Sequence, residues 1–314
     1  MEPETGPAFE LAGSYRQRPA VAHPAGWAAA LVTVVALVVA GVVLASRSGS
    51  HAPAVDPVAT TAAALAACPA TGHTDEFGIR SIEAAEVARL PDTYTFLRVG
   101  ADGCTPARFN PCAPVHFVQN VAAAPPFVAD NVREAFRRLS AATGIQFVDD
   151  GTTDETTRAS AYVPERYGPR WAPILIVWEH FPVDQTTGRS QILGQTTIAR
   201  QGDVTVSGRL RFNVDAYSNE TSLAPFQDGF GPPLGSGTGP ILRENVTWGR
   251  IVLHELAHVV GLGHTRDTAS LMYPDAALQT GRPADFAPPD GEGLRYLGRE
   301  AGCLTTPPAG PTAD

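Results

Sequence analysis

The sequence contains no lysine, and all 23 of its basic residues are arginine. Asp and Glu together number 32, so the formal net charge is −9 at pH 7. A protein that binds nucleic acid through its phosphates needs a basic excess to displace counterions. Because that excess is missing, we exclude a general phosphate-backbone binder and expect no nucleic-acid partner.

The sequence also lacks any C-x-x-C pair of the kind used for metal or redox chemistry. Its four cysteines are Cys68, Cys104, Cys112 and Cys303. All of them follow the one long apolar run, so we interpret them as two disulfides in an oxidising compartment. Four cysteines allow three pairings, and spacing alone does not choose among them. One thiolate held against a metal as an inhibitory ligand is the alternative.

The apolar run at residues 27–45 is nineteen residues long and carries no charge. That length crosses ~30 Å of hydrocarbon at ~1.5 Å per residue. Arg16 and Arg18 precede it and only Arg47 follows closely, which favours an N-terminus inside and the rest of the chain outside. We therefore expect a single-pass protein of the cell membrane. A signal peptide that is cleaved to release a secreted protein is the competing interpretation.

Composition divides the chain into five parts, with no internal repeat. They are a cytoplasmic tail (1–26), a transmembrane signal-anchor (27–45), an Ala/Pro/Thr-rich stalk (46–92), one folded domain (93–304) and a flexible C-terminal tail (305–314). Apolar patterns in the folded domain predict the strands 114–121, 145–151 and 173–178, and two weaker ones between 194 and 214. They also predict a helix from Val128 to Leu139, capped at Gly144, and a second helix over 248–260. This order indicates an α+β fold with one core.

The second predicted helix carries the sequence HELAHVVGLGH. His254 and His258 are four residues apart, so their side chains project about 40° from each other and both can reach one ion. Neutral imidazole is a good ligand for zinc. Glu255 lies about 100° round the helix from His254, which places its carboxylate beside the ion, where a base can take a proton from water.

A third ligand follows the helix. Gly261 allows the chain to leave the helix with positive φ, and His264 can then return to the ion. Three protein ligands leave the fourth position of a zinc ion open, as in catalytic sites. A helix with surface histidines and a zinc site without chemistry are the alternatives. Glu255 argues against the second, because binding alone does not need a carboxylate there.

The pattern H-E-x-x-H-x-x-G-x-x-H resembles the metzincin metallopeptidases, and within them the matrixin-like branch with its secreted bacterial members. Their methionine in a tight turn beneath the metal matches Met272. Met272, Gly261 and Tyr273 are therefore expected to have structural roles under the site. Tyr273 is not counted as a ligand, because the tyrosine ligand of other metzincins lies two residues after the methionine.

The resemblance covers about 200 residues. It includes the segments PARFNPCAPVHFVQN, REAFRRLSAATGIQFVDDGTTDE and DGEGLRYLGREAGC. It implies a metzincin-like catalytic domain with a twisted mixed β-sheet, an active-site helix and a C-terminal helix. It also implies one catalytic Zn²⁺ and a Cys112–Cys303 disulfide, which leaves Cys68–Cys104. The matrixin propeptide switch is absent from the sequence, and the P-x-Y element of the specificity pocket is reduced to Pro274, Asp275 and Ala276.

Other candidate sites have less support. Asp149, Asp150, Asp154 and Glu155 could attract Ca²⁺, but their spacing fits no standard loop, and a solvated acidic turn is favoured. His180 and Asp184 loosely resemble a structural zinc loop, but no histidine between 181 and 253 completes it. His116 has no identifiable partner.

The sequence as a whole predicts a zinc endopeptidase that acts on protein or peptide substrates, with Glu255 as the general base. We expect the substrate to lie extended against an edge strand at residues 192–200. Two alternatives remain open. One is a membrane-anchored zinc-binding protein without catalysis. The other is a zinc hydrolase of cell-wall or other non-protein amides.

Overall fold

A computed structural model of the chain describes residues 4–10, 73–74, 84–125, 128–181, 192–214, 247–276, 279 and 285–310. They belong to one compact unit that leaves out residues 13–62. The predicted span at 27–45 and Cys68 lie outside the described residues. Within the described part of the chain, no helix has the length and apolar character that crossing a membrane requires.

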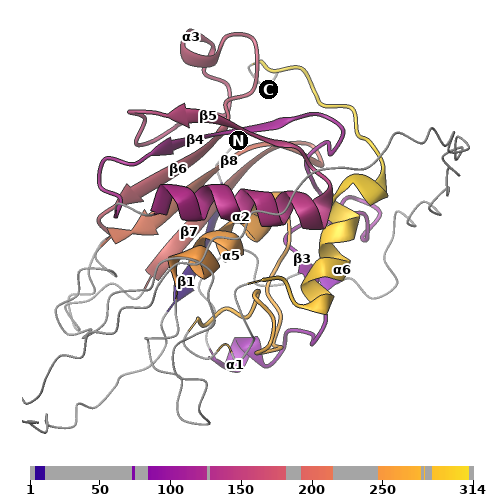
Figure 1. The fold of residues 1–314 in the computed structure, drawn as a ribbon. Coiled ribbons are helices and arrows are strands. Elements are labelled where there is room, and N and C mark those ends of the chain that lie inside the picture. The colour runs from indigo at the N-terminus through magenta and orange to yellow at the C-terminus, as the bar shows by residue number, and fades with distance from the viewer. Residues whose placement is uncertain are drawn as a thin grey trace, which may run out of the picture. The chain divides into compact units, whose positions relative to one another are not determined.

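The domain is built on a twisted mixed sheet (Figure 1). Its strands are β4 (Val115–Asn120), β5 (Phe147–Thr152), β6 (Ile174–Glu179), β7 (Ile192–Gln201) and β8 (Val204–Asn213). They lie in the order β7-β8-β6-β4-β5. All neighbouring pairs are parallel except β7 and β8, which form an antiparallel hairpin. The predicted α+β fold with a mixed sheet is confirmed.

A further strand was not predicted. β1 (Glu4–Glu10) pairs antiparallel with the outer edge of β7, with Glu4 opposite Ile198 and Glu10 opposite Ile192. It lies in the segment predicted as a cytoplasmic tail. The outer edge of β7 can therefore accept an extended segment in antiparallel register.

Two long helices, α2 (Val128–Thr143) and α5 (Trp248–Val260), cover the same face of the sheet (Figure 1). The bounds of α5 are those predicted. The helix α2 continues past the predicted Leu139 to Thr143, and the predicted cap Gly144 follows it with a left-handed φ of 69°. The remaining elements are α1 (Ala84–Val87), α3 (Pro164–Tyr167), α6 (Pro288–Leu297), the 3-10 helix η2 (Arg299–Ala301) and a small sheet of β2 (His73–Thr74) and β3 (Thr95–Phe96).

The core lies between these helices and the sheet. The ring of Phe117 on β4 stacks on that of Phe136 on α2, with centroids 3.8 Å apart. At the next layer, the Trp178 ring stacks on Phe212 and meets the edge of Trp248. These large buried rings fix α2 and α5 against the sheet.

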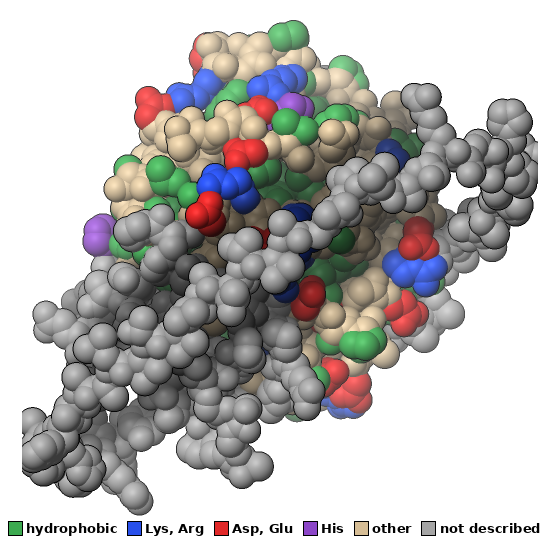
Figure 2. Space-filling model, viewed as in Figure 1, with side chains coloured by type: hydrophobic (Ala, Val, Ile, Leu, Met, Phe, Trp, Pro, Cys, Tyr) green, Lys and Arg blue, Asp and Glu red, His purple; other side chains and the backbone are tan. Residues whose placement is uncertain are grey.

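The predicted acidic cluster extends from β5 into the long connection between β5 and β6, and its acids are paired with basic side chains. Arg158 and Glu155 form an ion pair of 2.6 Å whose side chains are only 6% and 9% exposed. Asp154 pairs with Arg166, and Asp150 pairs with both His116 and Arg170. The expectation of a solvated acidic turn is thus corrected for Glu155, and His116 does have a partner. Figure 2 shows acidic and arginine side chains next to one another on this face of the molecule.

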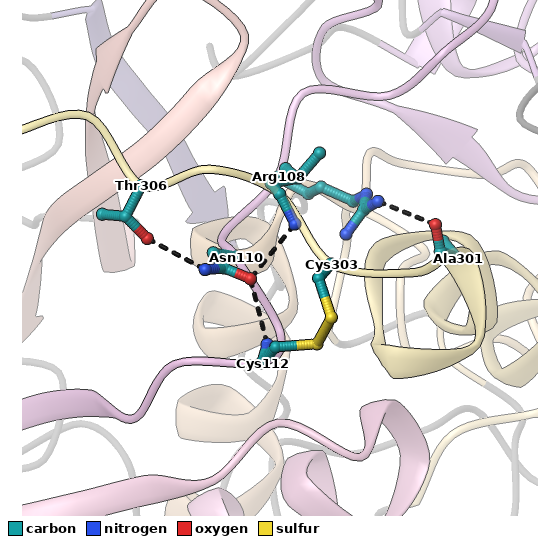
Figure 3. Close-up of a disulfide and its surroundings, with 7 residues drawn as sticks. Arg108, Asn110, Cys112, Ala301, Cys303 and Thr306 are labelled. Atoms are coloured by element: carbon teal, nitrogen blue, oxygen red, sulfur yellow. Dashed lines mark hydrogen bonds between the residues drawn. A yellow bond between two sulfur atoms is a disulfide. The ribbon is translucent and has the colours of Figure 1, made fainter.

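The C-terminal segment is attached to the start of β4 by the predicted Cys112–Cys303 disulfide (Figure 3). The Asn110 side chain accepts hydrogen bonds from the backbone N–H groups of Cys112 and Leu304 and donates one to Thr306 (Figure 3). Cys104 is disulfide-bonded as well, and its predicted partner Cys68 lies outside the described residues. The chain is therefore held in place up to Thr306, within the predicted flexible tail.

Candidate metal centre

The centre begins on α5, a helix that is buried along its whole length. The side chain of Thr247 caps its first turn by accepting the N–H of Arg250. Gly261 ends it with φ of 117°, a conformation that glycine adopts without strain. An added Cβ at this position would also lie 2.8 Å from the carbonyl oxygen of Ala107. The turn at Gly261 redirects the chain so that His264 faces the helix it has just left.

The three predicted ligands His254, His258 and His264 meet at one point. Their candidate ligand atoms all lie within 4.8 Å of one another, and all three side chains are buried. The rings of His254 and His258 are 4.6 Å apart between centroids, and those of His258 and His264 are also 4.6 Å apart. Such a group can hold a metal ion.

Hydrogen bonds orient two of these rings. The Nδ1 atom of His254 lies 2.7 Å from the carbonyl oxygen of Leu271, and Nδ1 of His258 lies 2.8 Å from that of Leu262. A carbonyl only accepts, so each Nδ1 carries the hydrogen and each Nε2 is left with its lone pair. The two Nε2 atoms lie 3.0 Å apart. Two lone pairs this close cannot hydrogen-bond to each other, so both are suited to bind one cation, and the backbone carbonyls have the position of outer-shell partners in known metal sites.

The electrostatics favour the neutral form of the first ligand, His254. Burial lowers the pKa of His254 well below its ordinary value, and the neighbouring His258 and His264 lower it further. Neutral imidazole is the form that binds zinc. The donor set of three histidines and no thiolate also suits this ion.

Glu255 lies beside the three histidines and is completely buried. Burial raises its pKa to about 8, and a hydrogen bond from the Thr196 hydroxyl acts in the opposite direction. A divalent cation held by the adjacent histidines would favour the ionised carboxylate.

The loop that carries His264 is held by the segment around β3. The Thr95 hydroxyl donates to the carbonyl oxygen of His264 at 2.6 Å, and the N–H of Gly263 donates to the carbonyl of Thr95 at 2.8 Å. Further out, Arg266 forms a two-pronged ion pair with Asp92. Asp92 belongs to the segment predicted as stalk, and Leu90 before it is only 2% exposed. Packing of the domain therefore begins before residue 93.

The turn beneath the histidines contains Met272, which is 1% exposed. The carboxylate of Asp290, on α6, holds this turn by accepting from the hydroxyl of Ser270 at 2.5 Å and the N–H of Leu271 at 3.0 Å. It also accepts from the N–H of Ala287 at the start of α6, as the acid of a capping box does. Asp290 thus joins the turn to the C-terminal helix.

Besides Asp290, Gln279 also holds this turn through hydrogen bonds. The amide nitrogen of Gln279 donates to the carbonyl oxygens of Leu271 and Tyr273, at 2.8 and 3.0 Å. Its amide oxygen accepts from the buried guanidinium of Arg250, on α5. Because the Leu271 carbonyl also accepts from His254, this network connects the turn with the first ligand.

The motif residues were found from sequence, and the residues that hold them were not. Thr95, Thr196 and Asp290 act through contacts with residues distant along the chain. Gln279 joins the nearby turn to Arg250, which is 29 residues away. Only Asp290 had a local signal, since an acid three residues after a helix start is typical of a cap. His180 is exposed, and Asp184 lies outside the described residues.

A mixed sheet, a buried helix and three converging histidines define the class of protein as a metal-site domain of the metzincin type. The matrixin family model, Peptidase_M10, matches residues 119–297, more than half of the chain. The chain therefore belongs to the matrixin family.

Among solved structures, the metalloproteinase-II of Bacteroides fragilis is similar, with a TM-score of 0.31 and 11% sequence identity. The match covers 62% of this chain and 55% of that protein, so the chain spans about half of the neighbour's length. No match is found among curated proteins.

Proposed function

We propose that the protein is a zinc-dependent endopeptidase in which His254, His258 and His264 hold the metal and Glu255 is the general base. The observation that carries the proposal is the convergence of three buried histidines with a buried carboxylate on the adjacent residue. Membership of a peptidase family supports the reaction class.

The chemistry divides between the ion and the chain. A zinc ion bound by the three histidines supplies a Lewis acid that polarises a carbonyl and makes water more acidic. Glu255 takes a proton from the attacking water and delivers it to the leaving amine nitrogen. The carbonyls of Leu271 and Leu262 keep the rings of His254 and His258 in one orientation during this exchange.

We further propose that the substrate binds as an extended strand along the outer edge of β7. The pairing of β1 with this edge, from Glu10 opposite Ile192 to Glu4 opposite Ile198, supports an extended antiparallel ligand there. Glu255 packs directly against β7 through Thr196, so a peptide on this edge runs past the carboxylate. The substrates are therefore proteins or peptides with an accessible extended segment.

For location, we propose a single-pass protein with residues 27–45 in the membrane and the domain outside the cytoplasm. The long uncharged run supports this placement. In the anchored protein, residues 4–10 would lie on the cytoplasmic face, so their pairing with β7 would not form and the β7 edge would be open to substrate. Protease protection of a tag at residue 1 and of a tag at residue 314, in intact cells, tests this: only the C-terminal tag should be digested.

The activity is tested by chelator-sensitive cleavage of a mixed peptide library, with a Glu255→Ala variant in parallel. We expect cleavage by the wild type, and an activity about 100- to 10,000-fold lower in the variant, with zinc per chain unchanged. Zinc binding without any cleavage would instead indicate a binding protein. Cleavage of non-protein amides alone would indicate another class of hydrolase.

A further inference from the structure

The Thr196 side chain lies against the proposed base. Thr196 is on β7 and is fully buried. Its hydroxyl oxygen is 2.6 Å from Oε2 of Glu255 and 3.1 Å from the backbone carbonyl oxygen of the same residue. A hydroxyl donates one hydrogen, and the shorter contact to the carboxylate is the stronger bond. Oε2 is therefore held by a donor from the strand.

The rest of the carboxylate has little freedom. Gly194 lies on the same face of β7, two residues before Thr196. A Cβ atom there would lie 2.8 Å from both Cγ and Oε1 of Glu255, so the glycine leaves just enough space for this side chain. Among the described residues, Oε1 has no hydrogen-bond partner. The strand thus donates a hydrogen bond to one carboxylate oxygen and packs against the other without bonding it.

A general base needs one oxygen at a defined position, because a misplacement of about 1 Å can reduce a rate by about 100-fold. We propose that Thr196 is a positioning residue, whose hydroxyl holds Oε2 of Glu255 so that Oε1 faces the attacking water. This inference rests on the proposed function and adds a residue outside the histidine motif. It also gives β7 a second role, since the strand that carries substrate then aligns the base.

The experiment compares three variants of the full chain. Thr196→Val keeps the shape of the side chain and removes the hydroxyl. Thr196→Ser keeps the hydroxyl and removes the methyl. Thr196→Ala removes both, so it differs from Thr196→Ser only in the hydroxyl. We expect kcat to fall about 10- to 100-fold in the Val and Ala variants, with KM within about twofold of wild type. The Ser variant should keep most of the wild-type kcat.

Two readouts besides activity separate alignment from damage to the fold. Zinc per chain should be equal in all variants, and a crystal structure of Thr196→Val should show the Glu255 carboxylate turned away from β7. If the Val variant folds poorly, the Ser and Ala pair still isolates the hydroxyl.

The wild type and Glu255→Ala are measured alongside. Equal kcat in the Ser and Ala variants, with an active wild type and an inactive Glu255→Ala, would overturn the role of Thr196 and leave the proposed function intact. An inactive wild type, or an active Glu255→Ala, would overturn the proposed function itself.

Discussion

Two glutamates in different parts of the domain, Glu155 with a side chain 9% exposed and Glu255 completely buried, have opposite electrostatic environments. Glu155, in the connection from β5 to β6, pairs with Arg158 and accepts from the Tyr167 hydroxyl. Burial acts to raise its pKa, but these hydrogen bonds outweigh burial and hold the pKa below its usual range. Glu255 receives a hydroxyl from Thr196 and no arginine among the described residues, and its pKa rises to about 8.

The difference shows which region contains the positive charge that balances its own acids. The connection from β5 to β6, called the outer connection below, contains arginines that pair with the acids in and next to it, so these acids are neutralised within the fold. The centre contains three histidines, among which burial favours the neutral form of His254, and a carboxylate without a basic partner in the described structure. A metal cation would complete the charge balance there, and the predictions below test this contrast.

The largest effect is expected for His258→Ala. Removal of one of three ligands should abolish metal binding and reduce peptide cleavage to background, because two histidines alone hold zinc weakly. Zinc per chain after dialysis is the measurement. His180→Ala is the matched control, since that histidine is exposed, and it should change neither quantity. A His258→Ala protein that retains zinc would show that the ligand set is wrong.

In the outer connection, Arg158→Met should destabilise the fold by about 3–5 kcal/mol, because it leaves the Glu155 carboxylate buried without its cation. The double variant with Glu155→Leu should recover most of that loss. Denaturant unfolding measures both. If Arg158→Met were as stable as the wild type, water would be solvating the Glu155 carboxylate well enough to replace the arginine. Zinc content should be unaffected in either variant.

Asp290→Ala should cost about 2–4 kcal/mol, because the buried N–H groups of Leu271 and Ala287 lose their acceptor. Asp290→Asn, which keeps an acceptor, should cost less.

Asp290 also predicts a pH dependence of stability. Burial raises the pKa of Asp290 to about 6, so the folded chain binds the carboxyl proton more tightly than the unfolded chain does. This tighter binding of the proton stabilises the folded chain by on the order of 2–3 kcal/mol below about pH 4, and the stabilisation is lost as the pH rises to about 6.

This pH dependence should be flatter in Asp290→Asn than in the wild type. The free energy of unfolding, measured between pH 4 and about 7 by denaturant titration, tests the difference. The same slope in both proteins would show that Asp290 does not cause it.

The smallest effect is expected for Arg133→Ala. Its partner on α2, Asp130, has a side chain that is 81% exposed, and Arg133 is itself 53% exposed. Exposed pairs of this kind contribute about 0–1 kcal/mol. A change in unfolding free energy of less than about 0.5 kcal/mol is expected, and addition of salt should remove it. If Arg133→Ala lowered the free energy of unfolding as much as Arg158→Met does, the contrast between shielded and exposed ion pairs would be wrong.

Local patterns predicted the elements of this fold and the motif of the site. The apolar run before Gly261 predicted α5 with its observed bounds, because the helix is buried and its end is marked by a glycine cap. The residues that hold the motif were not predicted, because their contacts are long-range. Thr196 is 59 residues from Glu255, and Thr95 is 169 residues from His264. Threonine in a strand has no local feature that separates such a role from ordinary packing.

The contact between β3 and the His264 loop also determines where the chain can be trimmed. A chain that begins at Ala84 keeps Pro91, Asp92 and Thr95, and with them all the contacts that support the third histidine. A chain that begins between Asp92 and Thr95 keeps the bond from Thr95 to His264 but loses the contacts of Pro91 with Thr265 and of Asp92 with Arg266. We therefore expect the shorter chain to hold its third histidine less firmly, although it contains every ligand, so a boundary chosen from the motif alone would weaken the metal centre.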